Sequence, residues 1–466
     1  MLDRQGRYLS RITNLFAEEG VTATDRRRIL RGTIHSFLIQ GISILLVFAS
    51  NWWLVRSTDT SSYGLYVHIF NWVSILSVLV MGGRDDLLLA QLPKYIVAGE
   101  HSRVRRMVRS ANRWIFFATL LIGAAFIGLI SVVPLRSLSE HRPLFLISIA
   151  AVYFSGCLSL NQVILQALDH VRQSQIVEKI ARPLLLIVFT GLYHLSVTRF
   201  DSKTLVILGT LVSALCCAII GAFVARNMRP YSPEAPGAPA SGTTAAIEAT
   251  EEPENHGQKT TYFFLISLFN LLSTKITMLI LPLFATEADL GIFNIAYRYA
   301  DLLIFPFFLM HSVLPQLFAR HSMTEADYTR RLYSESTRLM TLIALPLLLI
   351  NVLAGPFLLR LFGPAFATGY KALVYISLAQ FLFSLFGPAN TILMTQGKEK
   401  HSAMAVLIYV LVLIGSSWLL VPASGITGGA IAILISSLVY NGLLNGMVIR
   451  FYGIGAPFLA FLRKRH

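Results

Sequence analysis

The sequence has few charged residues and few cysteines, and both shortages narrow the class of protein. Asp, Glu, Lys and Arg make up 14% of the 466 residues, whereas soluble domains carry about 25%. The three cysteines, Cys157, Cys216 and Cys217, all lie in apolar runs, which favours buried, reduced thiols over a disulfide framework or a metal site. With 55% hydrophobic residues, the composition predicts a polytopic membrane protein.

Twelve apolar segments are long enough to cross the roughly 30 Å hydrocarbon core of a bilayer as helices. They are residues 33–54, 61–82, 114–134, 144–166, 177–197, 204–225, 261–284, 290–317, 339–359, 372–395, 402–421 and 425–449. The sequence therefore predicts an all-α fold of about 12 transmembrane helices.

Lys and Arg are unevenly distributed between the two sides of this predicted topology. With the N-terminus inside, the inward segments contain 30 of the 39 basic residues and the outward loops contain 7. The inward 30 include Lys179 and Arg182 at the start of the predicted fifth span, and the remaining two, Lys275 and Arg298, fall within predicted spans of the second half. The outward seven are Arg56, Arg136, Arg142, Arg199, Lys203, Arg360 and Lys371. The positive-inside rule therefore predicts that both termini are cytoplasmic, and basic loops beside an anionic leaflet explain the net charge of +15 without nucleic acid as a partner.

The second half of the chain repeats a feature of the first. Gly64-Leu65-Tyr66 and Gly291-Ile292-Phe293 each stand ahead of a long apolar run, 227 residues apart (291 − 64). Six spans per half is an even number, so the halves are predicted to be parallel repeats, a common plan among transporters. The expected units are a basic cytoplasmic N-terminal segment (1–31), a six-helix bundle (32–226), a disordered cytoplasmic linker (227–259), a second six-helix bundle (260–450) and a basic cytoplasmic tail (451–466).

Several stretches carry a resemblance to a known family. They are the repeated Gly-x-aromatic signature, GIFNIAYRYADL (291–302), HSVLPQLFARH (311–321) and GITGGAIAILISS (425–437). Together they resemble the multidrug/oligosaccharidyl-lipid/polysaccharide (MOP) exporter superfamily, and in particular its polysaccharide-transport branch of O-antigen and repeat-unit flippases. Many relatives have an acidic residue in the seventh span, near where this chain has Thr274 and Lys275, so no coupling ion is carried over and no cofactor is expected.

The resemblance implies a flippase for a lipid-linked oligosaccharide of the undecaprenyl-pyrophosphate type, working by alternating access through a cationic central cavity. It implies a multi-pass protein of the bacterial cytoplasmic (inner) membrane. The expected partners are the lipid bilayer, the lipid-linked glycan substrate and other glycan-assembly proteins.

Two alternatives stay open. A drug/cation antiporter of the same superfamily would be favoured by carboxylates deep in the first half, where the sequence has none; Glu178 lies near the entrance of the fifth span. A polytopic glycan-pathway enzyme, such as a ligase or polymerase, would need a sizeable outward loop with acid, base or metal ligands, and every outward loop is short. The sequence also has no Walker A pattern for ATP hydrolysis.

The candidate substrate-binding residues are polar groups predicted to lie inside the membrane, where an ionisable side chain is costly and marks a functional site by default. They are His68, Asn71, Asn270, Lys275, Asn294, Arg298 and Asp301. On the repeat offset, Arg298 occupies the position of Asn71, and helical spacing puts each polar set on one face. Lys275, Arg298 and Asp301 would give a cavity a net charge of +1, suited to a pyrophosphate head.

Each candidate also has a structural interpretation. Arg298 and Asp301 would form a local ion pair one turn apart, Lys275 would have a structural partner, and His68 and Asn71 would make hydrogen bonds between helices. Arg84, Asp85 and Asp86 follow the second span at its cytoplasmic end, where they are candidates for a gate or ordinary helix-end charges.

Overall fold

The computed structural model describes residues 23–132, 141–168, 170–195, 201–227, 256–311, 314, 318 and 326–453. Most of the predicted linker and most of the two predicted terminal segments lie outside these ranges, while residues 256–259 of the predicted linker begin α11. The division into units therefore remains a prediction for those parts of the chain.

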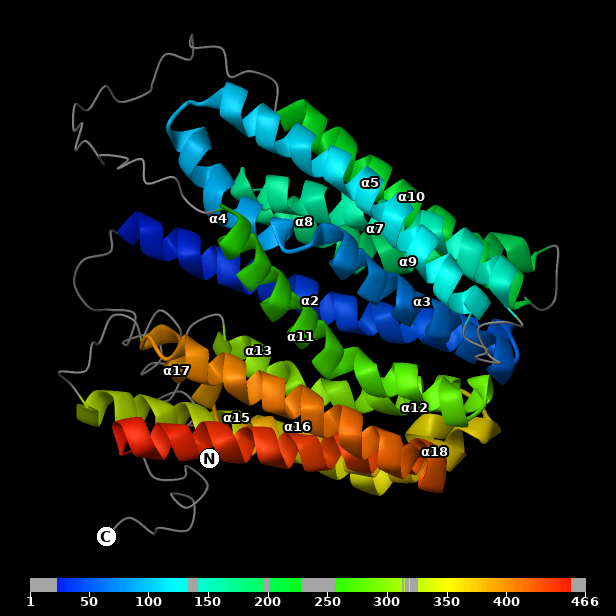
Figure 1. The fold of residues 1–466 in the computed structure, drawn as a ribbon. Helices are drawn as coiled ribbons and strands as arrows, with labels where there is room; N and C mark the ends of the chain where they lie inside the picture. Colours follow the sequence, from blue (N-terminus) through cyan, green and yellow to red (C-terminus); the bar gives the residue numbers. More distant parts are fainter. Residues whose placement is uncertain are drawn as a thin grey trace.

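Within the described ranges every regular element is a helix, and the helices form two bundles side by side (Figure 1). The N-terminal bundle contains α2 (Ala23–Ser57), α3 (Thr60–Met81), α4 (Arg84–Val97), α5 (His101–Val132), α7 (Arg142–Ala167), α8 (Val171–Ile176), the π-helix η1 (Val177–Ala181), α9 (Arg182–His194) and α10 (Ser202–Asn227). The C-terminal bundle contains α11 (His256–Phe284), α12 (Glu287–Asp301), η2 (Leu302–Ile304), α13 (Phe305–His311), α15 (Ala326–Arg360), η3 (Pro364–Gly369), α16 (Tyr370–Phe386), α17 (Ala389–Thr395) and α18 (Glu399–Tyr452). Helix α11 runs obliquely between the bundles and packs against both α4 and α18.

The predicted all-α membrane fold is confirmed. Eight of the described helices are long and apolar enough to cross a membrane, and residues Leu271–Phe284 form a shorter apolar helix. Where the structure describes them, the twelve predicted spans are helical, but two of them fall outside these helices. The fifth falls on the π-helix η1 and the short helix α9, and the eighth falls on α12, η2 and α13. The tenth is interrupted at Gly387, which has a φ of 80°.

The last two predicted spans are the two arms of α18. Its 54 residues would extend about 80 Å as one straight helix, far more than a bilayer requires. The chain instead turns at Gly425, where φ is 55° and ψ is −130°, and the arms lie side by side in Figure 1. A Cβ atom on Gly428 would lie 2.0 Å from the Leu420 carbonyl oxygen, so glycine is required for the backbone contact at the turn.

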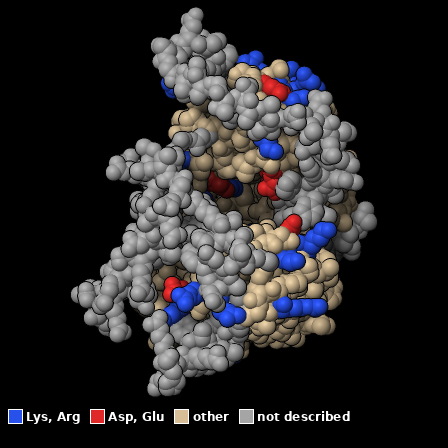
Figure 2. Space-filling view, turned by 90° about the vertical axis from the view of Figure 1, so that its left-hand side faces the viewer, with Lys and Arg blue, Asp and Glu red and all other residues tan. Residues whose placement is uncertain are grey.

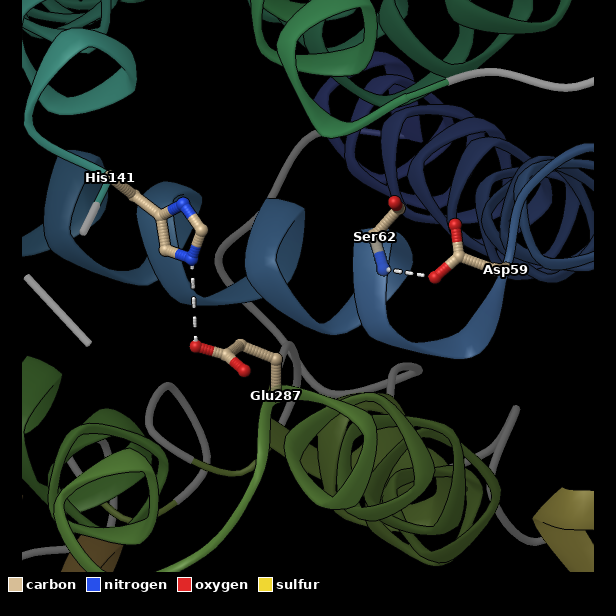
Figure 3. Close-up of polar contacts among 4 residues, drawn as sticks. All are labelled: Asp59, Ser62, His141 and Glu287. Carbon is tan, nitrogen blue, oxygen red and sulfur yellow. Dashed lines mark hydrogen bonds and ion pairs between the residues drawn. The ribbon is translucent and has the colours of Figure 1, made fainter. Parts of the chain in front are cut away.

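Helices α3 and α12 begin in equivalent ways. The side chain of Asp59 caps α3 by accepting a hydrogen bond from the backbone N–H of Ser62 at 2.9 Å (Figure 3). Thr286, 227 residues later, caps α12 in a reciprocal capping box with Asp289. The sequence repeat is thus also a repeat of local structure, and the two helices pack against each other between the bundles.

The two ends of the molecule differ in how the bundles meet. We call the end with the α2–α3, α11–α12 and α15–η3 connections the closed end. There one apolar core contains residues of both bundles, among them Leu54, Tyr63, Phe293 and Phe362. At the other end, which we call the open end, the bundles have separate cores: one includes Leu92 of α4, while the other includes Leu314, Phe318, Tyr333, Leu393 and Val448.

Candidate functional site

A hollow lies between the two bundles at the open end. Figure 2 views the molecule from that side and shows the hollow near the centre, with basic and acidic side-chain atoms visible deep inside it. Ionisable groups at membrane depth are tolerated where they face water, a partner charge or a ligand. The hollow is therefore the candidate functional site.

Three of the predicted site residues lie together in the C-terminal bundle. Lys275 comes from α11, and Arg298 and Asp301 come from the last turn of α12. All three side chains are partly buried, and each is close enough to the other two for their charges to interact. The structure thus places two cations and one carboxylate in one cluster, which we call the charged trio.

The cations of the charged trio keep their hydrogen-bond donors available. Within the described part of the chain, no carboxylate lies within the 4.0 Å ion-pair distance of either Lys275 or Arg298. The local Arg298–Asp301 ion pair is therefore not formed at that distance. A guanidinium and an ammonium held in this way offer charged donors to an anionic ligand.

Sequence reasoning missed a second guanidinium. Arg182, the first residue of α9, belongs to the N-terminal bundle, and its charge acts on the hydroxyl of Tyr66 in α3. The charge of Arg298 acts on the same hydroxyl. The sequence signal is that Arg182 stands inside the predicted fifth span, near its cytoplasmic end.

His68 and Asn71 do not join the charged trio. His68 is 2% exposed and accepts a hydrogen bond from the indole N–H of Trp72 at 3.1 Å, on its own helix. Asn71, also buried, donates its amide to the sulfur of Met278 in α11 at 3.6 Å. His68 is thus a core residue of the N-terminal bundle, and Asn71 contributes to the contact between bundles.

Asn294 also belongs to that contact. Its amide donates to the Tyr63 hydroxyl at 2.8 Å, and this hydroxyl donates to the side-chain oxygen of Asn51 at 2.7 Å. The chain of hydrogen bonds joins α12 to α3 and α2 with every participant uncharged. The side chain of Asn270 lies outside the described residues.

The three gate candidates lie where α4 begins, after a turn through Gly82 and Gly83 in left-handed conformations. The Arg84 guanidinium lies 3.7 Å above the ring of Trp114, a residue of the same bundle. Burial, together with the charge of Asp86, raises the pKa of the Asp85 carboxyl. Since α4 packs against α11, the position is at a junction of the bundles, and a gating role remains a prediction.

The glycines of the repeated signature meet at the closed end. A Cβ atom on Gly64 would lie 1.7 Å from the carbonyl oxygen of Glu287, and one on Gly291 would lie 3.3 Å from the Cα of Gly64. Equivalent positions of the two repeats are thus in direct backbone contact. The signature marks the place where the bundles are closest.

A partly exposed contact between an imidazole and a carboxylate crosses the bundles nearby. In Figure 3, His141 at the start of α7 and Glu287 at the start of α12 point toward each other, with 3.9 Å between Nε2 and Oε1. The indole N–H of Trp52 and the guanidinium of Arg56 also donate to the carbonyl of Leu361, at 3.0 and 3.1 Å. These contacts hold the bundles together at the closed end.

No group of three or more His, Cys, Asp or Glu side chains in the described residues is placed to hold a metal ion. The candidate site is therefore the charged trio, with Arg182, whose charge acts on Tyr66, as a further candidate.

Residues 258–371 match the family model of a polysaccharide biosynthesis protein, and this segment contains the whole charged trio. No curated protein sequence matches the chain.

Three solved structures illustrate the fold that the chain shares. An inward-facing multidrug transporter of the MATE family, in the MOP superfamily, superimposes with a TM-score of 0.63 at 15% identity, covering 88% of this chain and 95% of its own. The lipid II flippase MurJ, in an inward closed conformation, gives 0.62 at 12% identity and 93% of each chain. A MOP-superfamily transporter from Pyrococcus furiosus gives 0.57 at 14% identity, over 91% of this chain and 95% of its own.

These proteins are described as transporters and a flippase. The chain has the fold of the MOP-superfamily membrane transporters, and its residues 258–371 match the polysaccharide biosynthesis protein family.

Proposed function

We propose that this protein is a flippase for a lipid-linked oligosaccharide, whose anionic head crosses the membrane through the hollow while the lipid tail stays in the bilayer. The observation that carries the proposal is the charged trio, with two cations, one carboxylate and no described ion pair within 4.0 Å to satisfy the cations. A pyrophosphate accepts charged hydrogen bonds from such donors. A cationic drug would be repelled by the surplus positive charge.

Two comparisons support the choice of substrate class. The segment that holds the charged trio is the segment that matches a polysaccharide biosynthesis family. The fold is also that of MurJ, which is described as a lipid II flippase. For the Pyrococcus furiosus transporter, a binding pocket of reversed polarity is described as suggesting a different function, so pocket charge is a reasonable guide to substrate within this fold.

The open end faces the cytoplasm in this proposal. The positive-inside rule supports that orientation, because the start of α5 at the open end is rich in arginine. These residues are Arg103, Arg105, Arg106, Arg109 and Arg113. The head would then enter from the cytoplasm, and it would leave after the closed end opens and the open end closes.

Export of the cell-surface glycan tests the proposal. Arg298→Ala removes the guanidinium and should abolish export, while the amount of inserted protein stays normal. Arg360→Ala is the matched control, because Arg360 is an exposed arginine at the end of α15, away from the charged trio. Normal glycan in cells with Arg298→Ala would refute the proposal.

Lys275 gives a second arm of the same test. Lys275→Arg keeps the positive charge in the hollow, whereas Lys275→Gln removes it and keeps a polar side chain. Export with Lys275→Arg and loss of export with Lys275→Gln supports a charge role. Equal activity of the two variants would show that the charge at Lys275 is not used.

A further inference from the structure

We propose that the first part of α5 is a binding site for an anionic phospholipid, whose phosphate is held by arginines and whose acyl chains lie on the apolar surface that follows them. The arginines are Arg105, Arg106, Arg109 and Arg113, and we call them the arginine face. This site lies outside the hollow, so it does not depend on the substrate that the hollow carries.

Helix α5 is longer than a membrane crossing requires. It contains 32 residues, whereas about 20 are enough for the hydrocarbon core of a bilayer. Roughly twelve residues therefore extend beyond that core, and every Lys, Arg, Asp or Glu of α5 lies between His101 and Arg113. The first part of α5 thus passes through the headgroup layer.

The arginine face occupies one side of the helix. At about 100° per residue its four members fall within an arc of about 100°, and all four are exposed. On the opposite side, Val104, Ala111 and Ile115 belong to the core of the N-terminal bundle. Helix α5 packs against α3, α4 and α7 of that bundle, and Figure 1 shows it at the edge away from the C-terminal bundle. The arginine face therefore points outward, toward the surrounding membrane surface.

The same side of α5 becomes apolar one turn later. Phe117, Leu120 and Leu121 are 63%, 55% and 73% exposed, as expected of side chains that contact lipid tails. Trp114, which is 43% exposed, stands between the two regions, at the level where membrane proteins place their aromatic belts. This change from basic to apolar places the arginine face at the depth of the lipid phosphates.

Among the described residues, the arginine face has no carboxylate partner. Helix α5 contains no Asp or Glu, and no described carboxylate lies within 4.0 Å of these four guanidinium groups. Arg103 of the same helix differs, because it pairs with Glu100 at 2.8 Å and lies 5.0 Å from the centre of the Tyr95 ring. Arg103 is thus engaged within the protein and serves as a matched control.

An anionic phospholipid fits both the basic and the apolar part of this surface. A guanidinium donates two parallel hydrogen bonds to phosphate oxygens. Arg105, Arg109 and Arg113 follow one another at four-residue intervals, about 6 Å apart at their Cβ atoms, so one phosphate can lie between two of them. A soluble polyanion would leave the apolar part uncovered, and a zwitterionic lipid would bring an ammonium group that the arginines repel.

Native mass spectrometry of the full-length protein, released from detergent and titrated with phosphatidylglycerol, tests this site by its lipid affinity. Arg109→Gln should weaken the tightest binding about fivefold, the usual contribution of one arginine beside an anionic membrane surface. The double variant Arg109→Gln/Arg113→Gln should lose about 25-fold if the two contributions add. Arg109→Lys should lose less than Arg109→Gln because the charge remains. Arg103→Gln should stay within about twofold.

The choice of lipid separates the possible ligands. Phosphatidylcholine should bind about tenfold more weakly or less, and so should the soluble headgroup glycerophosphoglycerol, which lacks the acyl chains. Inorganic phosphate should not displace phosphatidylglycerol. A polyprenyl diphosphate that binds more tightly than phosphatidylglycerol, and loses this advantage in the double variant, would overturn the phospholipid assignment in favour of a substrate lipid.

A control at the same end of the molecule separates a site from general attraction. Lys400 is exposed on α18 at the open end. If Lys400→Gln or Arg103→Gln weakens binding as much as Arg109→Gln, the attraction is spread over the whole end and the site is wrong; an unchanged double variant would also overturn it.

Thermal unfolding without added lipid identifies any variant that does not fold, and the comparison of Arg109→Lys with Arg109→Gln still decides in that case. Failure here leaves the proposed function unaffected, because that proposal is tested by glycan export in Arg298→Ala.

Discussion

The two ends of the molecule hold the bundles together in different ways. At the closed end the bundles share an apolar core, uncharged hydrogen bonds such as that from Asn294 to Tyr63 and the backbone contact of Gly64 with Gly291. At the open end each bundle has its own core, and the hollow between them contains charged side chains (Figure 2).

Under the proposed function, this difference indicates which contacts must change during transport. Apolar and uncharged contacts at the closed end separate without stranding a charge. Under the proposed function, the cations of the charged trio bind an anion before the bundles come together around them. Substitutions should weaken the contact between the bundles at the closed end by decreasing amounts. The largest effect is expected from a backbone clash at Gly64, and none is expected from the loss of a helix cap at Asp201, which lies within one bundle.

Gly64→Ala should have the largest effect. The added Cβ would lie 1.7 Å from the Glu287 carbonyl oxygen, and because backbone cannot rotate away as a side chain does, the bundles must move apart. Overpacking of this kind costs about 3 kcal/mol or more, enough to shift the equilibrium between the two ends by about 100-fold. Glycan export should be lost with normal insertion.

The control for this variant is Gly442→Ala, because a Cβ on Gly442 meets nothing within 4 Å. Gly291→Ala should fall between the two, since its nearest neighbour is the Tyr63 ring at 3.1 Å. Wild-type export by Gly64→Ala would show that the glycine contact is not needed for closure.

Tyr63→Phe should have the next largest effect. It removes the hydroxyl that links Asn294 to Asn51 and leaves a buried amide without its acceptor, at a cost of about 1–3 kcal/mol. The closed end should open more often. Ser57 is buried at this end, so a cysteine introduced as Ser57→Cys reports on opening. In a variant without the native cysteines, it should react faster with a membrane-impermeant maleimide when the closed end opens more often.

Tyr370→Phe is the matched control for that measurement. It also removes a tyrosine hydrogen bond, to the Val352 carbonyl at 2.8 Å, but both residues belong to the C-terminal bundle. Equal labelling rates in the two variants would show that the Tyr63 hydroxyl does not hold the bundles together.

Glu287→Gln should have a smaller effect. The Nε2–Oε1 distance to His141 is 3.9 Å and both side chains are partly exposed, so the pair contributes less than about 1 kcal/mol. Labelling at Ser57→Cys should rise less than in Tyr63→Phe, and added salt should reduce the difference from wild type. If the labelling rate rises more in Glu287→Gln than in Tyr63→Phe, the contact between His141 and Glu287 stabilises the closed end more than the Tyr63 hydrogen bonds do, which would contradict this prediction.

Asp201→Asn should have the smallest effect and should not alter the balance between the ends. Hydrogen bonds from the Thr204 side chain and backbone lower the pKa of Asp201, which caps α10 within one bundle. Since its pKa is lowered by folding, its stabilisation is present above the ordinary value of 3.8 and is lost as the pH falls through the folded-state value. The carboxyl is exposed, so the loss is below about 1 kcal/mol.

Thermal unfolding measured from neutral to acid pH checks this prediction. Wild type should be slightly more stable than Asp201→Asn at pH 7, and the two should converge in acid. A change in Ser57→Cys labelling would show that a cap inside one bundle affects the contact between bundles.

Much of the fold was predictable because the lipid bilayer restricts which structures can cross it. A bilayer requires long apolar helices with their backbone groups paired internally, so the twelve spans stand out in the sequence. The turn at Gly425 was predictable as well, because the apolar run there is too long for one crossing.

The side-chain partners were harder to predict. Helical spacing places His68 and Asn71 on one face, but it does not say which neighbour that face meets; in the structure one contacts Trp72 and the other Met278. The Gly64 and Gly291 signature was recognised as a repeat, whereas its role as a contact needs the two helices in place. The π-helix before Arg182 changes the helical period itself, so a constant spacing of 3.6 residues misplaces everything after it.

Distances between spin labels test the central claim most directly, that the two ends open in alternation. One pair, Lys203→Cys and Ala365→Cys, is exposed on the two bundles at the closed end; the other, Arg105→Cys and Lys400→Cys, is exposed at the open end. Electron–electron double resonance would measure both distances in the Gly64→Ala variant and in wild type. A longer closed-end distance together with a shorter open-end distance is predicted, and a closed end that opens with no shortening at the other end would contradict the account.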